Sequence, residues 1–446
     1  MSRTIADQAV PESGGTIVAP ASGAGPSAVA VVRVSGPRTR AVLEALVGTV
    51  PEPRQASLRK LADIDRGLVL WFPAPRSFTG EDMAELQVHG SRAVVQALVE
   101  AVLEVEGTRL AEPGEFARRA FENGKLDLTE VEGLADLVNA ETEAQRRQAL
   151  AQSEGALRRL YEGWRAELVQ AQSLMEAGLD FADEADVAAN VSAKAAAIVA
   201  PLLQSIESHL ADRSGEVLRD GLRVVIAGPT NAGKSSLLNA LAKRDVAIVS
   251  EEAGTTRDVI EVHLDLGGLP VILADTAGIR SGISPVETEG IRRAFARAED
   301  ADLVLWVVDG TSPVFEPPEA LAQKPILRAL NKADITPELA PKDAAKCPLR
   351  LSAKTGEGLE GLIGGLEAAA RDRIGASSGA PITRARHRAE LVSTADALKR
   401  FVNHDLGPEL AAEELRLAAS HLGRLTGTIG VEEVLGAIFA EFCIGK

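Results

Sequence analysis

The chain has 446 residues, more than one compact core usually holds, and this length predicts about three domains. Its composition of 46% hydrophobic and 25% charged residues is ordinary for a globular protein and excludes a disordered or fibrous chain. The 48 basic and 64 acidic side chains give a formal net charge of −16, which excludes nucleic-acid binding over the whole surface. Any RNA would have to bind at a local basic patch.

Two cysteines, Cys347 and Cys443, are too few for a disulfide framework or a four-thiolate zinc site. The most apolar stretches, such as residues 303–308, have the length of a strand and not the ~20 residues of a membrane-spanning helix. No long apolar segment follows Arg3, so we expect no signal peptide. Together these features predict a cytoplasmic protein without a membrane partner.

The first part of the chain, residues 1–125, is predicted to be an α+β domain. Short runs at 28–34 and 67–72 are rich in strand-forming residues and are bounded by Gly or Pro. The pattern changes at residue 126, after which apolar residues recur at helical spacing through 127–213. The same helical pattern returns at 386–401, 409–425 and 431–442.

Strands and helices alternate between the two helical stretches. Apolar runs predict strands at 223–227, 260–266, 271–274, 303–308, 326–330 and 349–351. Most of these runs are continuously apolar, which is typical of parallel strands covered on both faces. We therefore predict an α/β domain, residues 219–373, inserted into a discontinuous helical domain formed by 126–218 and 374–446.

The strongest motif is Gly228-Pro-Thr-Asn-Ala-Gly-Lys-Ser235, a phosphate-binding loop between a predicted strand and a predicted helix at 234–241. Its glycines let backbone N–H groups wrap a phosphate at the positive end of that helix. Lys234 is expected to reach the β- and γ-phosphates, and the Ser235 hydroxyl to bind Mg²⁺. The loop residues expected to contact the nucleotide are Asn231, Ala232, Gly233, Lys234, Ser235 and Ser236.

Three further segments follow predicted strands in the order of a guanine-nucleotide domain. Asp275 can bind Mg²⁺ through water, and the carboxylate of Asp334 can accept both N–H groups of guanine, which adenine lacks. The segments are Asp275-Thr276-Ala277-Gly278, Asn331-Lys332-Ala-Asp334 and Ser352-Ala353-Lys354. Together they predict a GTP site rather than an ATP site.

The segment Gly254-Thr-Thr-Arg-Asp258 is typical of a first switch, with Thr256 as a second Mg²⁺ hydroxyl. Ile279 stands where Ras-type enzymes place a water-orienting Gln, so hydrolysis needs another group. Arg280, Glu287 and Glu289 lie nearby, although they could equally be charges exposed to water.

These motifs together resemble bacterial GTPases that include Era, Der and the MnmE (TrmE) family, and the outer segments favour the last. The segments are Ser77-Phe-Thr-Gly-Glu-Asp82, Glu85-Leu-Gln-Val-His-Gly90, Pro113-Gly-Glu-Phe-Ala-Arg-Arg-Ala-Phe121, Asn123-Gly-Lys-Leu-Asp-Leu128 and Phe442-Cys-Ile-Gly-Lys446. Era would need a KH domain and Der a second phosphate-binding loop. The resemblance to MnmE covers nearly the whole chain.

This resemblance implies that the chain modifies wobble uridine 34 of certain tRNAs at C5, adding a carboxymethylaminomethyl or aminomethyl group. It implies a Ras-like P-loop G domain at 219–373 and an N-terminal folate-binding domain at 1–125 that also forms the dimer. It implies that the homodimer acts with the flavoprotein MnmG (GidA) in a heterotetramer. The one-carbon donor would be 5-formyl- or 5,10-methylene-tetrahydrofolate, held by Arg33, Glu85, Lys125 and Lys446 in the N-terminal domain. One departure is that residues 21–29 lack the family's Arg-Gly-Gly and contain Pro26.

The resemblance also implies activation by K⁺ and by pairing of two G domains. The K⁺ ligands would be Asn231, Ser250, Glu252 and Thr255, and the residues expected to contact the nucleotide there are Ser250, Glu251, Glu252, Ala253, Gly254, Thr255 and Thr256. Glu287 would orient the attacking water.

Three questions stay open on the sequence. Cys443 is either a catalytic thiol or a small buried residue. Residues 383–400 carry a net charge of +3 and could face tRNA or simply water. The rival function is a switch GTPase of ribosome assembly, like Era or Der, that modifies no RNA.

Overall fold

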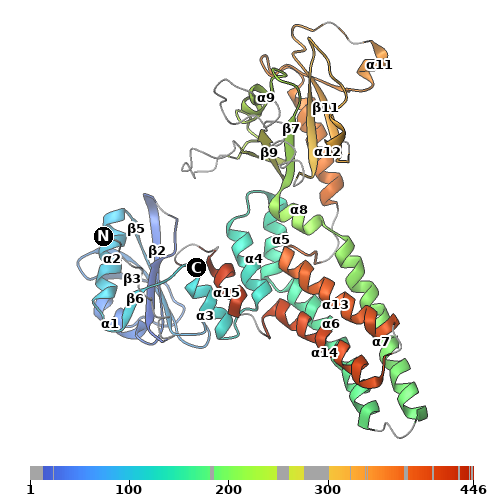
Figure 1. The fold of residues 1–446 in the computed structure, drawn as a ribbon. Helices are drawn as coiled ribbons and strands as arrows, with labels where there is room; N and C mark the ends of the chain where they lie inside the picture. The colour runs from blue at the N-terminus through green and yellow to red at the C-terminus, as the bar shows by residue number, and fades with distance from the viewer. Residues whose placement is uncertain are drawn as a thin grey trace, which may run out of the picture. The chain divides into compact units, whose positions relative to one another are not determined.

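The computed structural model describes residues 14–23, 25–180, 185–248, 261–275, 301–321, 323–336, 338, 340–375, 380–403, 406–429, 432–440, 442 and 445. They form two compact units, and the structural statements below concern these residues (Figure 1). The first unit comprises residues 1–135 and 423–446, and the second comprises residues 136–422. Of the helices described, none is long and apolar enough to cross a membrane.

The first unit contains a six-stranded mixed sheet in the order β3-β4-β5-β2-β1-β6. Its strands pair antiparallel, apart from the parallel pair β1–β6. Helices α1 and α2 cover one face of this sheet through Val42, Leu43 and Leu98. Every second residue of a strand points to the same face, so the apolar strand residues on that face are buried under the two helices. The bounds are β1 Thr16–Pro20, β2 Ser27–Ser35, α1 Thr39–Val47, β3 Ser57–Leu61, β4 Asp65–Phe72, β5 Met83–Gly90, α2 Arg92–Leu103 and β6 Thr108–Leu110.

A second core of this unit joins segments from both ends of the chain. Helices α3 (Glu115–Glu122), α4 (Leu128–Val138) and α15 (Glu432–Ala440) meet there. Phe439, Leu128 and Val131 are buried in it. The end of the chain therefore packs with α3 and the start of α4 within the first unit.

The helical part of the second unit confirms the helices expected in 127–213 and at 386–401 and 409–425. Its bounds are α5 Glu143–Ser153, α6 Ala156–Asp180, α7 Ala185–Ala211, α8 Ser214–Asp220, α13 Ala385–Asn403 and α14 Pro408–Thr426. Helix α7 packs against α6 and α13 (Figure 1). Buried aromatic rings join them, because Tyr161 meets His387 edge-on with centroids 5.9 Å apart and Trp164 meets His209 at 5.0 Å.

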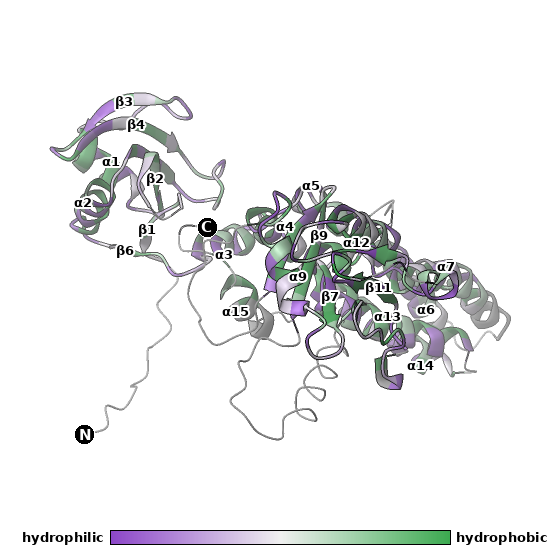
Figure 2. Ribbon diagram, turned by 90° about the horizontal axis from the view of Figure 1, so that it is seen from above, coloured by the Kyte–Doolittle hydropathy of each residue, from purple (hydrophilic) through white to green (hydrophobic). Residues whose placement is uncertain are grey.

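The remaining part of the second unit is an α/β domain with a six-stranded sheet in the order β12-β11-β10-β7-β9-β8. All six predicted strands are present, and all pair parallel except β8, which forms an antiparallel hairpin with β9. Every residue of β10 is buried, and β7 has the green of hydrophobic residues in Figure 2. The bounds are β7 Leu222–Ala227, α9 Lys234–Leu241, β8 Glu261–Leu266, β9 Leu269–Asp275, β10 Leu303–Asp309, β11 Ile326–Asn331, α11 Pro341–Ala344, β12 Leu349–Arg350 and α12 Leu359–Ile374.

Candidate nucleotide-binding site

The phosphate-binding loop connects the end of β7 to the start of α9, as its sequence predicts. Gly233 has φ +92°, and a Cβ there would lie 2.3 Å from Asn331 Nδ2. A Cβ on Gly228 would lie 2.4 Å from Val307 O. Both glycines are therefore required by close packing as well as by backbone conformation. Asn231 also adopts the left-handed region, with φ +66°.

The two side chains at the start of α9 that are expected to contact phosphate and metal are Lys234 and Ser235. Lys234 Nζ donates to the carbonyls of Gly228 and Pro229 at 3.0 Å each, and burial lowers the pKa of this lysine. Ser235 Oγ donates to Asp275 Oδ2 at 2.6 Å. A hydroxyl and a carboxylate at this distance are oxygen donors of the kind that Mg²⁺ prefers. The residues present therefore fit a bound magnesium ion.

The base-recognition segments meet at the carboxyl edge of the same sheet. Asn331 is 2% exposed; its Nδ2 donates to Ala232 O at 2.8 Å, and its Oδ1 accepts from Ala353 N at 2.9 Å. Ser352 Oγ donates to Asp334 Oδ1 at 2.7 Å. One buried amide thus links the phosphate loop to the two segments expected around guanine.

Asp309, at the same edge of the sheet, was absent from the sequence prediction. Its Oδ2 lies 2.6 Å from Lys332 Nζ. Asp309 ends β10 as Asp275 ends β9, and it is in register with Asn331 at the end of β11. Its position directly after a buried strand is the sequence signal that could have revealed it, because ligand groups gather at this edge.

Several expected site residues lie outside the described residues, and their roles stay predictions. In the G domain they are Ser250, Glu251, Glu252, Ala253, Gly254, Thr255, Thr256, Thr276, Ala277, Gly278 and Glu287, and near the end of the chain Cys443 and Lys446. Cys347, the other cysteine, is 3% exposed, and burial raises the pKa of its thiol to about 11.

In the first unit, the structure brings two of the four expected folate residues into contact. Arg33 on β2 is the register partner of Glu85 on β5, and Arg33 Nη2 lies 2.9 Å from Glu85 Oε1. The Arg33 guanidinium also lies over the rings of Phe78 and Phe116, at 5.5 and 5.7 Å, and its Nη1 donates to Gly445 O at 3.4 Å. The end of the chain therefore reaches this pair.

Lys125, the third expected folate residue, makes a different contact, because its Nζ donates to Pro75 O at 3.0 Å.

An ionic network that the sequence did not reveal lies in the same unit. Arg119 binds both Glu81, at 3.0 Å, and Glu115, at 2.9 Å. Burial would raise the pKa of Glu115, but hydrogen bonds from Arg109, the Glu112 backbone and Arg119 lower it to about 2.

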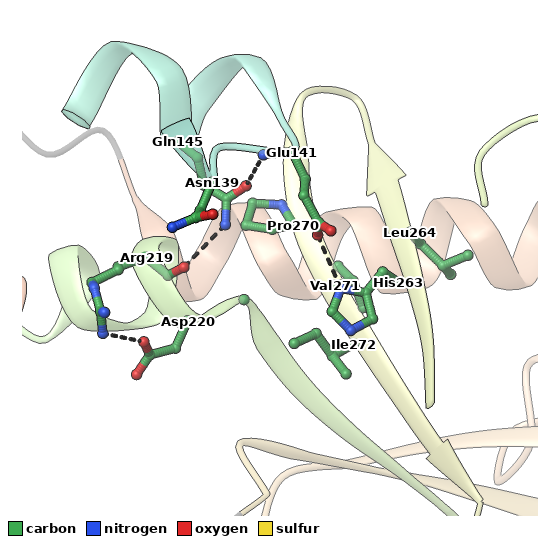
Figure 3. Close-up of a pocket in the computed structure, with 11 residues that line it drawn as sticks. Asn139, Glu141, Gln145, Arg219, Asp220, His263, Leu264, Pro270, Val271 and Ile272 are labelled. Atoms are coloured by element: carbon green, nitrogen blue, oxygen red, sulfur yellow. Dashed lines mark hydrogen bonds and ion pairs between the residues drawn. The ribbon is translucent and has the colours of Figure 1, made fainter. Parts of the chain in front are cut away.

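A pocket of about 240 Å³ lies where the helical part meets the β8–β9 hairpin, and it contains no expected site residue (Figure 3). Glu141 Oε2 lies 2.9 Å from His263 Nδ1 across it, and Gln145 Nε2 donates to Arg219 O at 3.0 Å. Ala144 N donates to Gly268 O at 3.1 Å beside it. The Glu141–His263 and Ala144–Gly268 contacts fasten the hairpin to the start of α5, and the Gln145–Arg219 bond joins α5 to α8.

The basic segment 383–400 is largely used inside the helical part. Four of its basic side chains form ion pairs, at 2.8 to 3.0 Å, with acidic residues of other helices, α4 among them. The pairs are Arg384–Asp136, Arg388–Glu216, Lys399–Glu207 and Arg400–Glu414. The segment therefore holds the helices together, which weakens its interpretation as a tRNA-facing surface.

The P-loop, the Mg²⁺-type pair Ser235–Asp275 and the guanine-type segments define a GTPase domain. Comparison with known proteins agrees with this class and refines it. Residues 16–125 match the family model described as GTP-binding protein TrmE N-terminus, and residues 128–443 match the MnmE helical domain.

Proteins named tRNA modification GTPase MnmE are similar over nearly the full length. The one from Beijerinckia indica is 52% identical over 438 residues, covering 97% of this chain and 96% of the relative. That from Brucella anthropi is 52% identical, covering 97% and 98%, and that from Parvibaculum lavamentivorans is 52% identical, covering 97% and 100%. The chain belongs to the MnmE (TrmE) family of GTPases.

Proposed function

We propose that this chain hydrolyses GTP to drive modification of the wobble uridine 34 of certain tRNAs. With a flavoprotein of the MnmG (GidA) type, it adds a carboxymethylaminomethyl or aminomethyl group at C5. The observation that carries this proposal is the likeness over 97% of the chain to tRNA modification GTPases, combined with the Ser235–Asp275 and Ser352–Asp334 hydrogen bonds at the nucleotide site. The proposed location is the cytoplasm.

The GTP site assigns each side chain a task that its chemistry suits. Lys234 pairs with the β- and γ-phosphates, and Asp334 accepts the two N–H groups of guanine while Ser352 holds it in place. Ser235 and Thr256 would hold Mg²⁺, which would neutralise charge on the phosphates.

Hydrolysis is assigned to Glu287, which orients water, because Ile279 replaces the usual glutamine. Asn231, Ser250, Glu252 and Thr255 would hold K⁺, which would supply positive charge beside the phosphates. Asn231 supports this assignment, since a left-handed backbone, here at φ +66°, is uncommon for a non-glycine residue and is often found at functional sites. K⁺-dependent pairing of two G domains in the homodimer activates the reaction.

The folate site is proposed around Arg33 and Glu85. A glutamate can accept the paired N–H groups of a pterin, and the half-buried ring of Phe78 beside Arg33 offers apolar surface for such a ring. Lys125 and Lys446 suit the anionic part of a 5-formyl- or 5,10-methylene-tetrahydrofolate, which supplies the one-carbon unit. Cys443, two residues before Gly445, is proposed to act in the modification chemistry.

The activity is tested by GTP hydrolysis with the purified full-length chain. We expect hydrolysis of GTP but not ATP, faster in potassium than in sodium buffer. Lys234→Ala abolishes it, whereas Lys342→Ala, on the short helix α11, leaves it unchanged. Equal hydrolysis of ATP, or full activity of Lys234→Ala, contradicts the proposal.

A further inference from the structure

Asp309 is fixed at the end of β10 by bonds to both of its carboxylate oxygens. Oδ2 receives the Lys332 ammonium at 2.6 Å, and Oδ1 accepts from Thr311 N at 2.9 Å and Thr311 Oγ1 at 2.7 Å. The residue is 7% exposed. Although burial acts to raise it, the pKa of Asp309 is lowered by these bonds, so the carboxylate stays charged near neutral pH.

The partner of Asp309 has an unusual backbone. Lys332 has φ +67°, a left-handed conformation that is unfavourable for a non-glycine residue. Its carbonyl accepts from Thr336 Oγ1 at 2.8 Å and from Ile335 N at 3.1 Å. Such a conformation persists only where surrounding contacts hold it.

The turn after β10 and the segment after β11 are joined through more than this ion pair. Gly310 N donates to Asn331 O at 3.0 Å, one residue from each member of the pair. On the other side of Lys332, Asp334 accepts from the Ser352 hydroxyl at 2.7 Å. The 331–334 turn is therefore anchored at one end by β10 and presents Asp334 at the other.

We propose that Asp309 is a positioning residue for guanine recognition, which holds Lys332 and thereby sets the turn that presents Asp334 to the base. The inference rests on the proposed guanine site. Asp309 lies on the strand neighbouring β11 and acts through Lys332, so its loss leaves the phosphate end of the site intact. Without it, the ammonium has no buried counter-charge and the left-handed turn loses one of its restraints.

Asp309→Asn in the full-length chain tests this. We expect GDP to bind about tenfold more weakly, because a charge-assisted hydrogen bond is lost. The preference for GDP over IDP should shrink. The base of IDP, hypoxanthine, lacks the 2-amino group whose hydrogen bond Asp334 would accept. Turnover at saturating GTP should change less than about twofold. The control Asp343→Asn, on α11, should change neither quantity.

A double-mutant cycle separates positioning from general stability. In the Lys332→Met background, Asp309→Asn should weaken GDP binding less than about twofold, because the partner is already gone. Equal losses in both backgrounds overturn the proposal. Thr311→Val, which keeps the carboxylate but removes one of its donors, should lower GDP affinity and the GDP-to-IDP preference in the same direction. An unchanged preference in Thr311→Val overturns the proposal even if Asp309→Asn does not fold.

Asp334→Asn distinguishes this inference from the guanine site on which it rests. If Asp334→Asn abolishes the preference for guanine while Asp309→Asn leaves it at the wild-type value, only the role of Asp309 is wrong. If Asp334→Asn leaves the preference unchanged, the proposed guanine site is wrong as well.

Discussion

The Ser235 hydroxyl donates to Asp275 at 2.6 Å, which joins the start of α9 to the last residue of β9. The two residues are 40 positions apart, and the parallel pairing of β7 with β9 brings them together. A serine and an aspartate placed in this way are suited to hold a magnesium ion between the protein and the nucleotide phosphates.

Ser235→Ala should raise the Mg²⁺ concentration that half-saturates GTP hydrolysis and lower turnover at least about tenfold, since one oxygen ligand is lost. Magnesium titrations of steady-state hydrolysis measure both. Ser173→Ala, on the exposed side of α6, serves as the matched control. A normal magnesium requirement in Ser235→Ala would exclude this hydroxyl from the metal site.

Glu287→Ala should abolish most hydrolysis while GTP affinity stays nearly unchanged, because orienting water contributes to the transition state and not to binding. Single-turnover hydrolysis and equilibrium binding of GTP measure the two effects. Glu289→Ala, two positions along the chain, should remain close to wild type. Near-normal turnover of Glu287→Ala at saturating K⁺ would be incompatible with this assignment.

Glu115→Gln should make the first unit less stable at neutral pH, by about 3 kcal/mol, because it leaves Arg109 and Arg119 without their shared buried partner. Since folding lowers the Glu115 pKa from 4.5 to about 2, its stabilisation is complete above pH 4.5. The stabilisation is lost as pH falls toward 2, so the variant should lose less stability on acidification than the wild type.

Trp71, which is 5% exposed on β4, can report the unfolding of this unit in a chain whose other two tryptophans are replaced by Phe. Denaturant titrations at several pH values then give the pH dependence directly. Glu112→Gln removes the looser, more exposed pair with Arg118 at 3.6 Å and should have little effect. Parallel pH profiles for wild type and Glu115→Gln would show that the network does not stabilise the charged form.

Glu85→Gln should weaken binding of 5-formyl-tetrahydrofolate to the full-length chain at least about tenfold, because the amide accepts fewer of the pterin N–H groups and no longer pairs with Arg33. Calorimetric titration measures the affinity. Glu44→Gln, in an exposed pair on α1, is the control. Unchanged affinity in Glu85→Gln would place the folate elsewhere.

The sheet of the G domain could be predicted from the sequence because its strands are buried on both faces. All seven residues of β10 are buried, so the strand is a continuous apolar run that local pattern reveals. The motifs of the nucleotide site follow such strands directly. Their order therefore predicted that Asn331, Asp334 and Ser352 belong to one site before any contact was known.

The remaining features depend on contacts between distant residues, which no local pattern reveals. Arg384 pairs with Asp136, far away in the sequence, so the charge run at 383–400 could not be distinguished from an exposed surface. On their residue types alone, Arg33 and Glu85 were surface charges, because only the register of β2 with β5 pairs them. Asp309 was missed because it belongs to no recognised motif.

The central claim is that the chain acts on tRNA rather than only switching between nucleotide states. Nucleoside analysis by mass spectrometry of tRNA tests it most directly, in a strain whose own gene for this protein is deleted. We predict unmodified wobble uridine in the deletion strain, modified uridine when the wild-type chain is restored, and no restoration by Lys234→Ala. Normal wobble uridines in the deletion strain, with ribosome precursors accumulating, would contradict the account.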